Sequence, residues 1–159
     1  MNKLILILSL SIVGLLSCKK EGDAPNTDFL EAVKNSPDSI AIGTNLLTLD
    51  ASLWRDFMPG PGSSENGSLL YCVVELKNSQ NLDLHENITL KRVYVFNGNE
   101  HWNSVLAEQD YGLGHIVIGT ASGGPVWGPE IHVDVVCEFE YNGVTRMIRS
   151  KSQNIDMTM

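Results

Sequence analysis

The feature that most constrains the fold is an alternation of apolar and polar residues, which dominates the chain after Thr44. In one segment the apolar residues take the even positions: Leu70, Cys72, Val74 and Leu76. In another they take the odd positions: Ile131, Val133, Val135, Cys137, Phe139 and Tyr141. Successive side chains of a strand point to opposite faces, so this period of two predicts strands with one buried face. It also places both thiols on the buried side.

Seven segments are expected to be strands, and turn residues separate several of them. The segments are 46–50 with the neighbouring Leu53, 69–77, 88–96, 102–108, 115–120, 131–141 and 145–155. Asn97-Gly98-Asn99 and Asn142-Gly143 are typical of hairpin turns, because Asn and Gly tolerate a positive φ. About seven short strands with such turns predict an all-β fold, an antiparallel immunoglobulin-like sandwich.

The spacing of Cys72 and Cys137, which are 65 residues apart, resembles that of the inter-sheet disulfide of immunoglobulin domains. The resemblance implies a disulfide, which would add about 2–4 kcal/mol of stability in an oxidising compartment. Two buried free thiols, which behave as small apolar side chains, are the alternative. The chain departs from the immunoglobulin pattern because segment 88–96 lacks the expected core Trp.

Residues 1–17 have the pattern of a secretory signal, with Lys3 before an apolar stretch at 4–16 and with Ser17 before Cys18. The thirteen apolar residues are too few to span a bilayer, which needs about 20. Leu15, Ser17 and Cys18 resemble the cleavage motif of bacterial lipoproteins. That resemblance implies cleavage after Ser17 and acylation of Cys18 with palmitate or related chains. We therefore expect a lipid anchor in the membrane.

The segment Lys19-Lys20-Glu21-Gly22-Asp23 resembles the surface-export signal of Bacteroidetes-type lipoproteins. This resemblance implies an outer-membrane protein of the cell envelope. The inner leaflet and the outward leaflet of that membrane are both open as its location. A solvated tether is the alternative, because such residues bury little apolar area. Asp38-Ser39-Ile40 matches the O-glycosylation acceptor pattern of these bacteria, with Ser39 as the acceptor.

Composition divides the chain into three parts: a signal peptide at 1–17, a lipidated Cys with a tether at 18–44, and a β-domain at 45–159. The tether is polar and contains Pro25 and Pro37. Within it, Asp28 followed three residues later by Glu31 predicts a short helix that ends near Asn35.

The acidic charge bears on the choice of partners. The chain has 11 Lys and Arg against 19 Asp and Glu, and only Lys3 of these lies in the signal. The remainder therefore carries a formal charge of −9, against −8 for the whole chain. Such a surface repels phosphate backbones, so nucleic acid is not expected as a partner.

Two loops supply the candidate binding residues, which are Trp54, Arg55, Asp56, Phe57 and Trp127. Gly and Pro surround these side chains and restrict the backbone, which favours a preorganised binding surface. The motifs Trp-Arg-Asp-Phe-Met-Pro and Gly-Gly-Pro-Val-Trp-Gly-Pro resemble those of secreted bacterial β-domain proteins, which implies a shared fold. In the alternative, the aromatic rings cap the ends of the sandwich, and Arg55 and Asp56 satisfy loop carbonyls and amides.

No catalytic motif was found, and no cofactor is expected. Glu130, His132 and Asp134 occupy alternate positions, about 6.8 Å apart on one strand face, which is close enough to suggest a metal site. Glu138 and Glu140 continue this face, so a solvated surface explains it equally well. We expect an envelope module that binds an envelope protein or a glycan. The alternative is a small hydrolase or metal-dependent enzyme that uses this face or Asp56.

Overall fold

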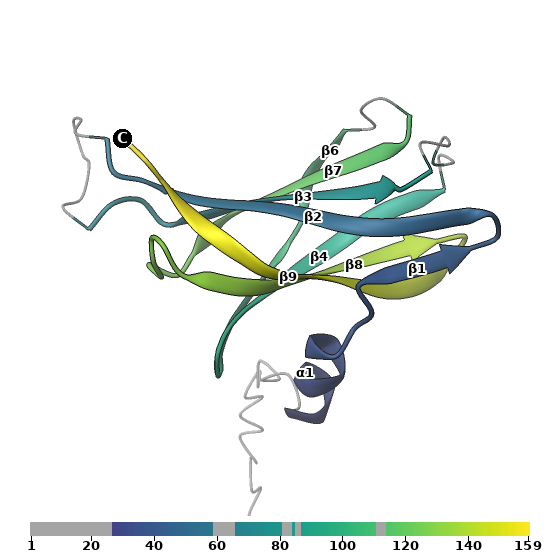
Figure 1. The fold of residues 1–159 in the computed structure, drawn as a ribbon, viewed down its shortest axis with the longest axis horizontal. Helices are drawn as coiled ribbons and strands as arrows, with labels where there is room; N and C mark the ends of the chain where they lie inside the picture. Colours follow the sequence, from purple (N-terminus) through teal and green to yellow (C-terminus); the bar gives the residue numbers. More distant parts are fainter. Residues whose placement is uncertain (1–26, 59–65, 81–83, 85–86, 111–113) are drawn as a thin grey trace, which may run out of the picture.

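The computed structural model describes residues 27–58, 66–80, 84, 87–110 and 114–159. These residues form one helix and nine strands (Figure 1). In chain order they are α1 (Thr27–Lys34), β1 (Ser39–Ile42), β2 (Asn45–Asp56), β3 (Leu70–Asn78), β4 (Ile88–Asn97), β5 (Glu100–Val105), β6 (Ala107–Asp110), β7 (Ile116–Gly124), β8 (His132–Tyr141) and β9 (Val144–Thr158). The predicted signal at 1–17, Cys18 and the segment 19–23 lie outside the described residues.

The predicted alternation is confirmed in the strands that form the core. In β3 the even positions from Leu70 to Leu76 are at most 1% exposed. In β8 the inward residues Val133, Val135, Cys137 and Phe139 belong to the same buried cluster. Burying each large apolar side chain contributes about 1.5–3 kcal/mol, which fixes the face that each strand turns inward.

The strands form one curled, mixed sheet in the order β5-β4-β8-β9-β2-β3-β7-β6, and β1 pairs with β2. The first part of β9 runs antiparallel to β8, and its last residues run parallel to β2, where Ile155 lies opposite Leu53. The all-β prediction is confirmed. A wholly antiparallel arrangement is wrong at the β2–β9 pair, and the immunoglobulin-like sandwich is not confirmed.

The segment predicted as one strand at 102–108 is split at Leu106 into β5 and β6. Leu106 is 6% exposed, and its amide donates to the carbonyl of Lys91 at 3.0 Å. Before this residue β5 pairs with β4, and after it β6 pairs with β7. The chain therefore crosses at Leu106 from one end of the strand order to the other, which brings the two ends of the curled sheet together.

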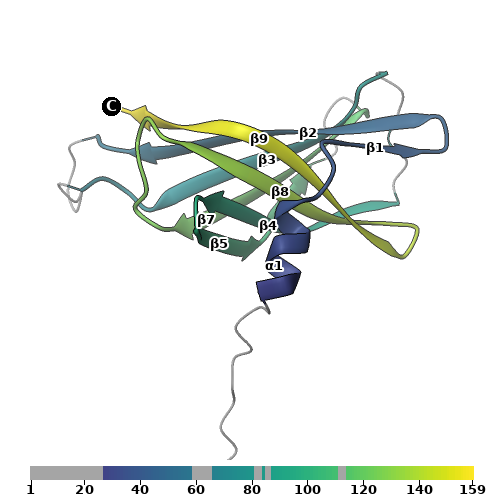
Figure 2. The same ribbon diagram turned by 60° about the horizontal axis from the view of Figure 1, so that its bottom comes forward.

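Helix α1 covers the outer face of β4 and β8 (Figure 2). Val33 is fully buried in a second cluster, with Tyr94 and Phe96 of β4 and Val136 of β8. The ring of Phe29 meets that of Tyr94 edge-on, with centroids 6.1 Å apart. The predicted helix is confirmed, and it is stabilised by packing because eight residues are too few to be stable alone.

The prediction of a tether to residue 44 is wrong for residues 27–44. The side chain of Arg149 on β9 donates to the carbonyl of Lys34 and, at 3.2 Å, to Asp38. Ser39 then opens β1, which pairs with β2, and its side chain is exposed. Residues 27–44 pack on the sheet because α1 has an apolar face. The average composition of this polar segment does not reveal that face.

No helix among the described residues is long and apolar enough to span a membrane.

Candidate ligand-binding site

Arg55 is a buried cation that joins two loops at the end of β2. It is only 3% exposed. Its nitrogens donate to four carbonyl oxygens, those of Ser68 at 2.9 Å, Gly128 at 2.9 Å, Val126 at 3.4 Å and Asn66. A planar guanidinium with five donors suits such a convergent set of carbonyls. Arg55 therefore holds the segments 66–68 and 126–128 in place.

Phe57 covers this buried cation. The guanidinium carbon of Arg55 lies 4.9 Å from the ring centroid of Phe57, which is a cation–π contact. Gly67 also lies against this ring, and a Cβ added there would be 2.7 Å from a ring carbon. The aromatic ring, the cation and the glycine thus form one packed unit.

Asp56 organises the same end of the sheet. Its Oδ1 accepts from the amide of Met58 at 2.8 Å and from the hydroxyl of Thr158 at 3.3 Å. Its own amide donates to the hydroxyl of Ser68 at 2.8 Å. For Arg55 and Asp56 the structure agrees with the alternative in which they satisfy loop carbonyls and amides.

Trp54 lies on the opposite face of β2 from Leu53 and Arg55. It is paired across the strands with Tyr71 of β3, and the two rings stack with centroids 5.8 Å apart and planes within 12°. Tyr71 is 40% exposed. The pair presents a rigid, amphipathic aromatic surface on the outside of the sheet.

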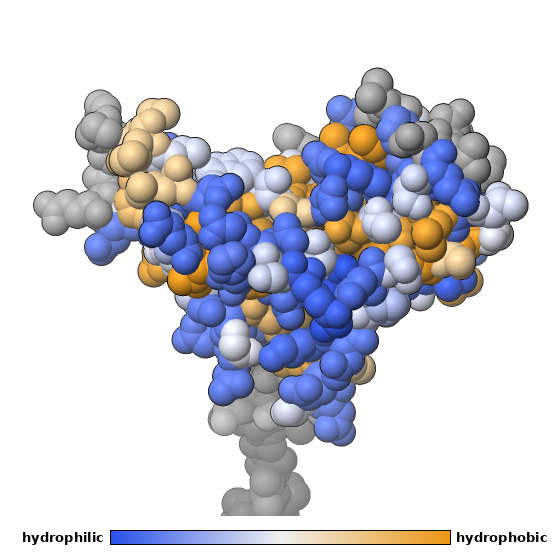
Figure 3. All heavy atoms as spheres, viewed as in Figure 1, coloured by the Kyte–Doolittle hydropathy of each residue, from blue (hydrophilic) through white to orange (hydrophobic). Residues whose placement is uncertain are grey.

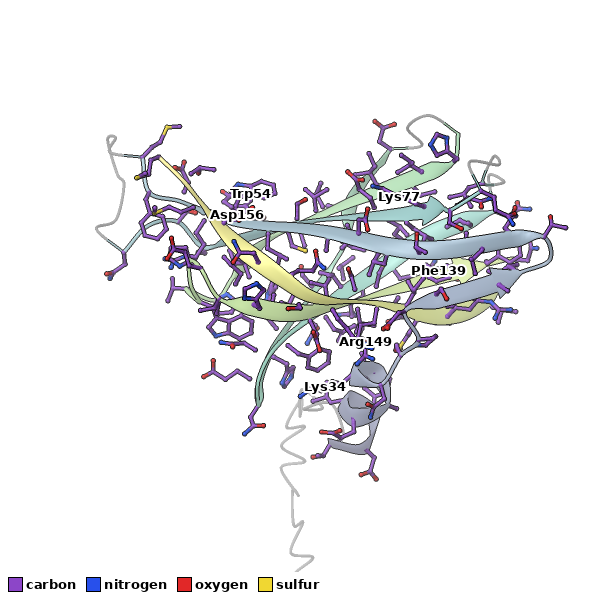
Figure 4. The ribbon with its side chains drawn as sticks, viewed as in Figure 1. Lys34, Trp54, Lys77, Phe139, Arg149 and Asp156 are labelled. Atoms are coloured by element: carbon purple, nitrogen blue, oxygen red, sulfur yellow. The ribbon has the colours of Figure 1, made fainter. Side chains whose placement is uncertain are left out.

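This pair borders a hollow of about 510 Å³, which we call the aromatic groove. Trp54, Tyr71 and Val73 form one side, and Ser104, Val105 and Ala107 form the other. Thr120 and Ser122 lie between the two sides, because β7 lies between β3 and β6 in the sheet. The upper outline of the molecule is indented (Figure 3), and Trp54 lies at this indentation (Figure 4).

The chemistry of the aromatic groove is neutral. None of its described lining residues carries a charge. The hydroxyl of Thr120 donates to the carbonyl of Ala107 at 3.1 Å, and that of Ser104 donates to the carbonyl of Val105 at 3.2 Å. Both hydroxyl oxygens keep lone pairs that can accept a hydrogen bond. The groove thus combines aromatic faces with uncharged polar atoms.

A second, shallower hollow of about 550 Å³ lies between β5 and the loop after β7. We call it the two-tryptophan hollow, and its principal side chains are Glu100, His101, Trp102, Pro125 and Trp127. Trp102 packs closely on Gly124, where an added Cβ would be 3.0 Å from the indole. Both Trp102 and Trp127 are partly buried against the core. Trp127 thus serves the core and also lines a hollow.

The three residues that the sequence suggested for a metal site have separate surroundings in the structure. Glu130 precedes β8 in a positive-φ conformation, and His132 is exposed. Asp134 accepts from the amide of Ser152 at 2.9 Å, at an irregularity within the β8–β9 ladder. Within the described ranges, no group of three or more His, Cys, Asp and Glu side chains is positioned to hold a metal ion.

Cys72 and Cys137 are both buried free thiols. The predicted disulfide is therefore not formed in the structure, which has the second of the two alternatives. Burial raises the pKa of Cys72 to about 12. Burial, followed by the effects of nearby Cys72 and Glu138, raises the pKa of Cys137 far above its usual range. Both thiols act here as apolar core side chains.

Sequence reasoning identified Trp54 and Trp127 but missed most of the residues around them. Those missed are Tyr71, Ser104, Thr120, His101 and Trp102. For Tyr71 a signal was present, because the alternation in β3 turns a large ring outward. Its place beside Trp54 depends on the pairing of β2 with β3, which lies outside any local pattern.

Comparisons with protein-family models, with curated proteins and with solved structures found no match to this chain. The class that the fold and the two hollows define is a mostly β protein with an aromatic surface site.

Proposed function

We propose that this chain is a lipid-anchored binding module of the bacterial cell envelope, and that its aromatic groove holds a neutral saccharide. The observation that carries the proposal is the stacked pair of Trp54 and Tyr71 beside an uncharged hollow of about 510 Å³. That volume is within the range of about 300–1,000 Å³ typical of small-molecule sites. Sugar rings offer apolar C–H faces to aromatic rings and hydroxyl groups to Ser and Thr.

Rigidity and charge support this ligand class. Trp54 and Tyr71 stand on neighbouring paired strands, so little side-chain freedom is lost on binding. The formal charge of −8 and the uncharged lining both favour a neutral ligand over an anionic one. The proposal concerns binding, because no described arrangement of side chains suggests a reaction.

The immunoglobulin-like sandwich remains part of this proposal. Inward residues of β2 and β3 pack in one cluster with those of β4 and β8, as two facing layers would. The sandwich requires two facing layers that meet only at β9 and at the β5–β6 segment. A solved structure without two such layers would contradict it.

The ligand class is tested by calorimetry on the purified full chain, in a detergent without a sugar headgroup. The probes are glucose, xylose, galactose, mannose and N-acetylglucosamine with their short linear oligomers. We expect at least one to bind, and Trp54→Ala to weaken it about tenfold or more. Leu46→Ala is the matched control, because Leu46 is an exposed apolar residue on the same face of β2. Absence of binding to every probe, or equal effects of the two variants, would overturn the proposal.

The anchor needs a separate test. Wild type and Cys18→Ala are expressed in a Gram-negative host, labelled with a palmitate analogue, and probed by protease on whole cells. We expect label on wild type alone, and cleavage in intact cells if the domain faces outward. Label on both proteins, or on neither, would reject a lipid anchor at Cys18.

A further inference from the structure

We infer that the aromatic groove and the two-tryptophan hollow are two subsites of one elongated site for a linear neutral oligosaccharide. The inference rests on the proposed function and names the form of its ligand.

The two hollows share the same pair of strands. β5 lines the aromatic groove with Ser104 and Val105, and it lines the two-tryptophan hollow with residues 100–102. β7 likewise contributes residues 120–122 to the first and residues 123–124 to the second. The hollows therefore follow one another along the seam between β5 and β7.

The seam exists because β6 accompanies β7 only as far as Thr120, which lies opposite Ala107. Among the described pairings, the remaining residues of β7 bond only to β3, and β5 bonds only to β4. No ladder joins β5 to the end of β7 in this part of the chain. The backbones of β5 and the end of β7 are thus not hydrogen-bonded to each other beside the two hollows, and Trp102 packs on Gly124 between them.

The length of the seam favours a chain over a single ring. From Ser104 to Glu100 the strand advances roughly 13 Å, at about 3.3 Å per residue. This is longer than one pyranose ring. Aromatic side chains stand at both ends of the seam, Trp54 and Tyr71 at one and Trp102 and Trp127 at the other.

The polar groups of the second subsite also suit a polyol. Glu100 and His101 are exposed beside the two indoles, and they can accept and donate hydrogen bonds to sugar hydroxyls. Glu100 disfavours an acidic ligand at this end. Two linked subsites raise the affinity for a ligand that fills both, because the second contact becomes intramolecular.

The test is a chain-length series from monomer to hexamer of whichever probe sugar binds, measured by calorimetry on the full chain. For wild type we expect the hexamer to bind about tenfold or more tighter than the monomer. For Glu100→Ala and His101→Ala we expect the ratio of hexamer affinity to monomer affinity to fall toward one. Trp54→Ala should weaken both ligands. Glu100 and His101 are exposed, so loss of folding does not confound the results for their variants.

Equal affinity of monomer and hexamer for wild type would overturn the elongated site and leave the proposed function standing. A length gain that survives in both Glu100→Ala and His101→Ala would also overturn it. Absence of binding to any saccharide would instead reject the proposed function itself.

Discussion

Arg55 donates a hydrogen bond to the carbonyl of Gly128, 73 residues further along the chain, at 2.9 Å. The contact links the end of β2 to the loop that carries Trp127. Because Arg55 is buried and its described partners are carbonyls, its charge stabilises loop geometry and not an ion pair. The position of Trp127 thus depends on a residue of strand β2, which the sequence pattern had assigned to a loop.

Replacing Arg55 by Lys should lower the free energy of unfolding by about 3 kcal/mol, because one ammonium cannot reach carbonyls that a guanidinium fork reaches. The measurement is the urea midpoint of the purified chain. Arg92→Lys is the matched control, since the side chain of Arg92 donates to Asn103 at 2.9 Å on a partly exposed surface. We expect that control to lose less than about 1 kcal/mol. Similar losses in both would show that Arg55 does not clamp the loops.

Gly67→Ala should destabilise the protein much more than Gly98→Ala. Both glycines have positive φ, +74° and +60°, but only Gly67 faces the ring of Phe57. We expect a loss of about 1 kcal/mol for Gly98→Ala, from the backbone alone, and about 3 kcal/mol for Gly67→Ala. Chemical denaturation of both variants gives the comparison. Equal losses would mean that the ring of Phe57 moves away freely.

Tyr94 should ionise late in an alkaline titration. Partial burial, followed by the charge of Glu138 at 3.1 Å from the hydroxyl, raises the pKa of Tyr94 to about 12 from its usual value of 10.0. The stability that neutral Tyr94 contributes is fully present below pH 10 and is lost as the pH rises through about 12. Tyrosinate absorbance should lack this late step in Tyr94→Phe, and Glu138→Gln should shift it to lower pH. A late step that persists in Tyr94→Phe would assign it to another residue.

The two core thiols should be inert in the native state. In the full chain with Cys18→Ala, a disulfide-exchange reagent should react with neither thiol until denaturant is added, and then with both. Burial and the raised pKa of Cys72 leave almost no accessible thiolate at neutral pH. Protein purified from an oxidising compartment should retain both thiol hydrogens by mass spectrometry. A missing pair of hydrogens, with no reaction on unfolding, would instead support the disulfide.

Individual residues explain how far the sequence predicted the fold and the site. The inward faces of Cys72 and Cys137 were predictable, because alternation along a strand is a local property. The break at Leu106 was not, since the chain there stops pairing with β4 and begins to pair with β7, a partner set by long-range contacts. The candidate binding residues have different roles in the structure. Trp54 lines the aromatic groove, whereas Arg55 is buried beneath the loops.

The inward-facing side chains follow from local sequence alone, because period-two alternation and turn residues act within a few residues of each other. The short helix was also predictable from its local residues, although Asp28 lies in its first turn and does not cap it, and its stability comes from packing. The contact between Trp54 and Tyr71, and the placement of β5 beside the end of β7, depend on the tertiary structure. These neighbours come from long-range strand pairing, whose free energy depends on closing long loops and burying a shared core. The proposed elongated site lies along β5 and the end of β7, which do not pair with each other.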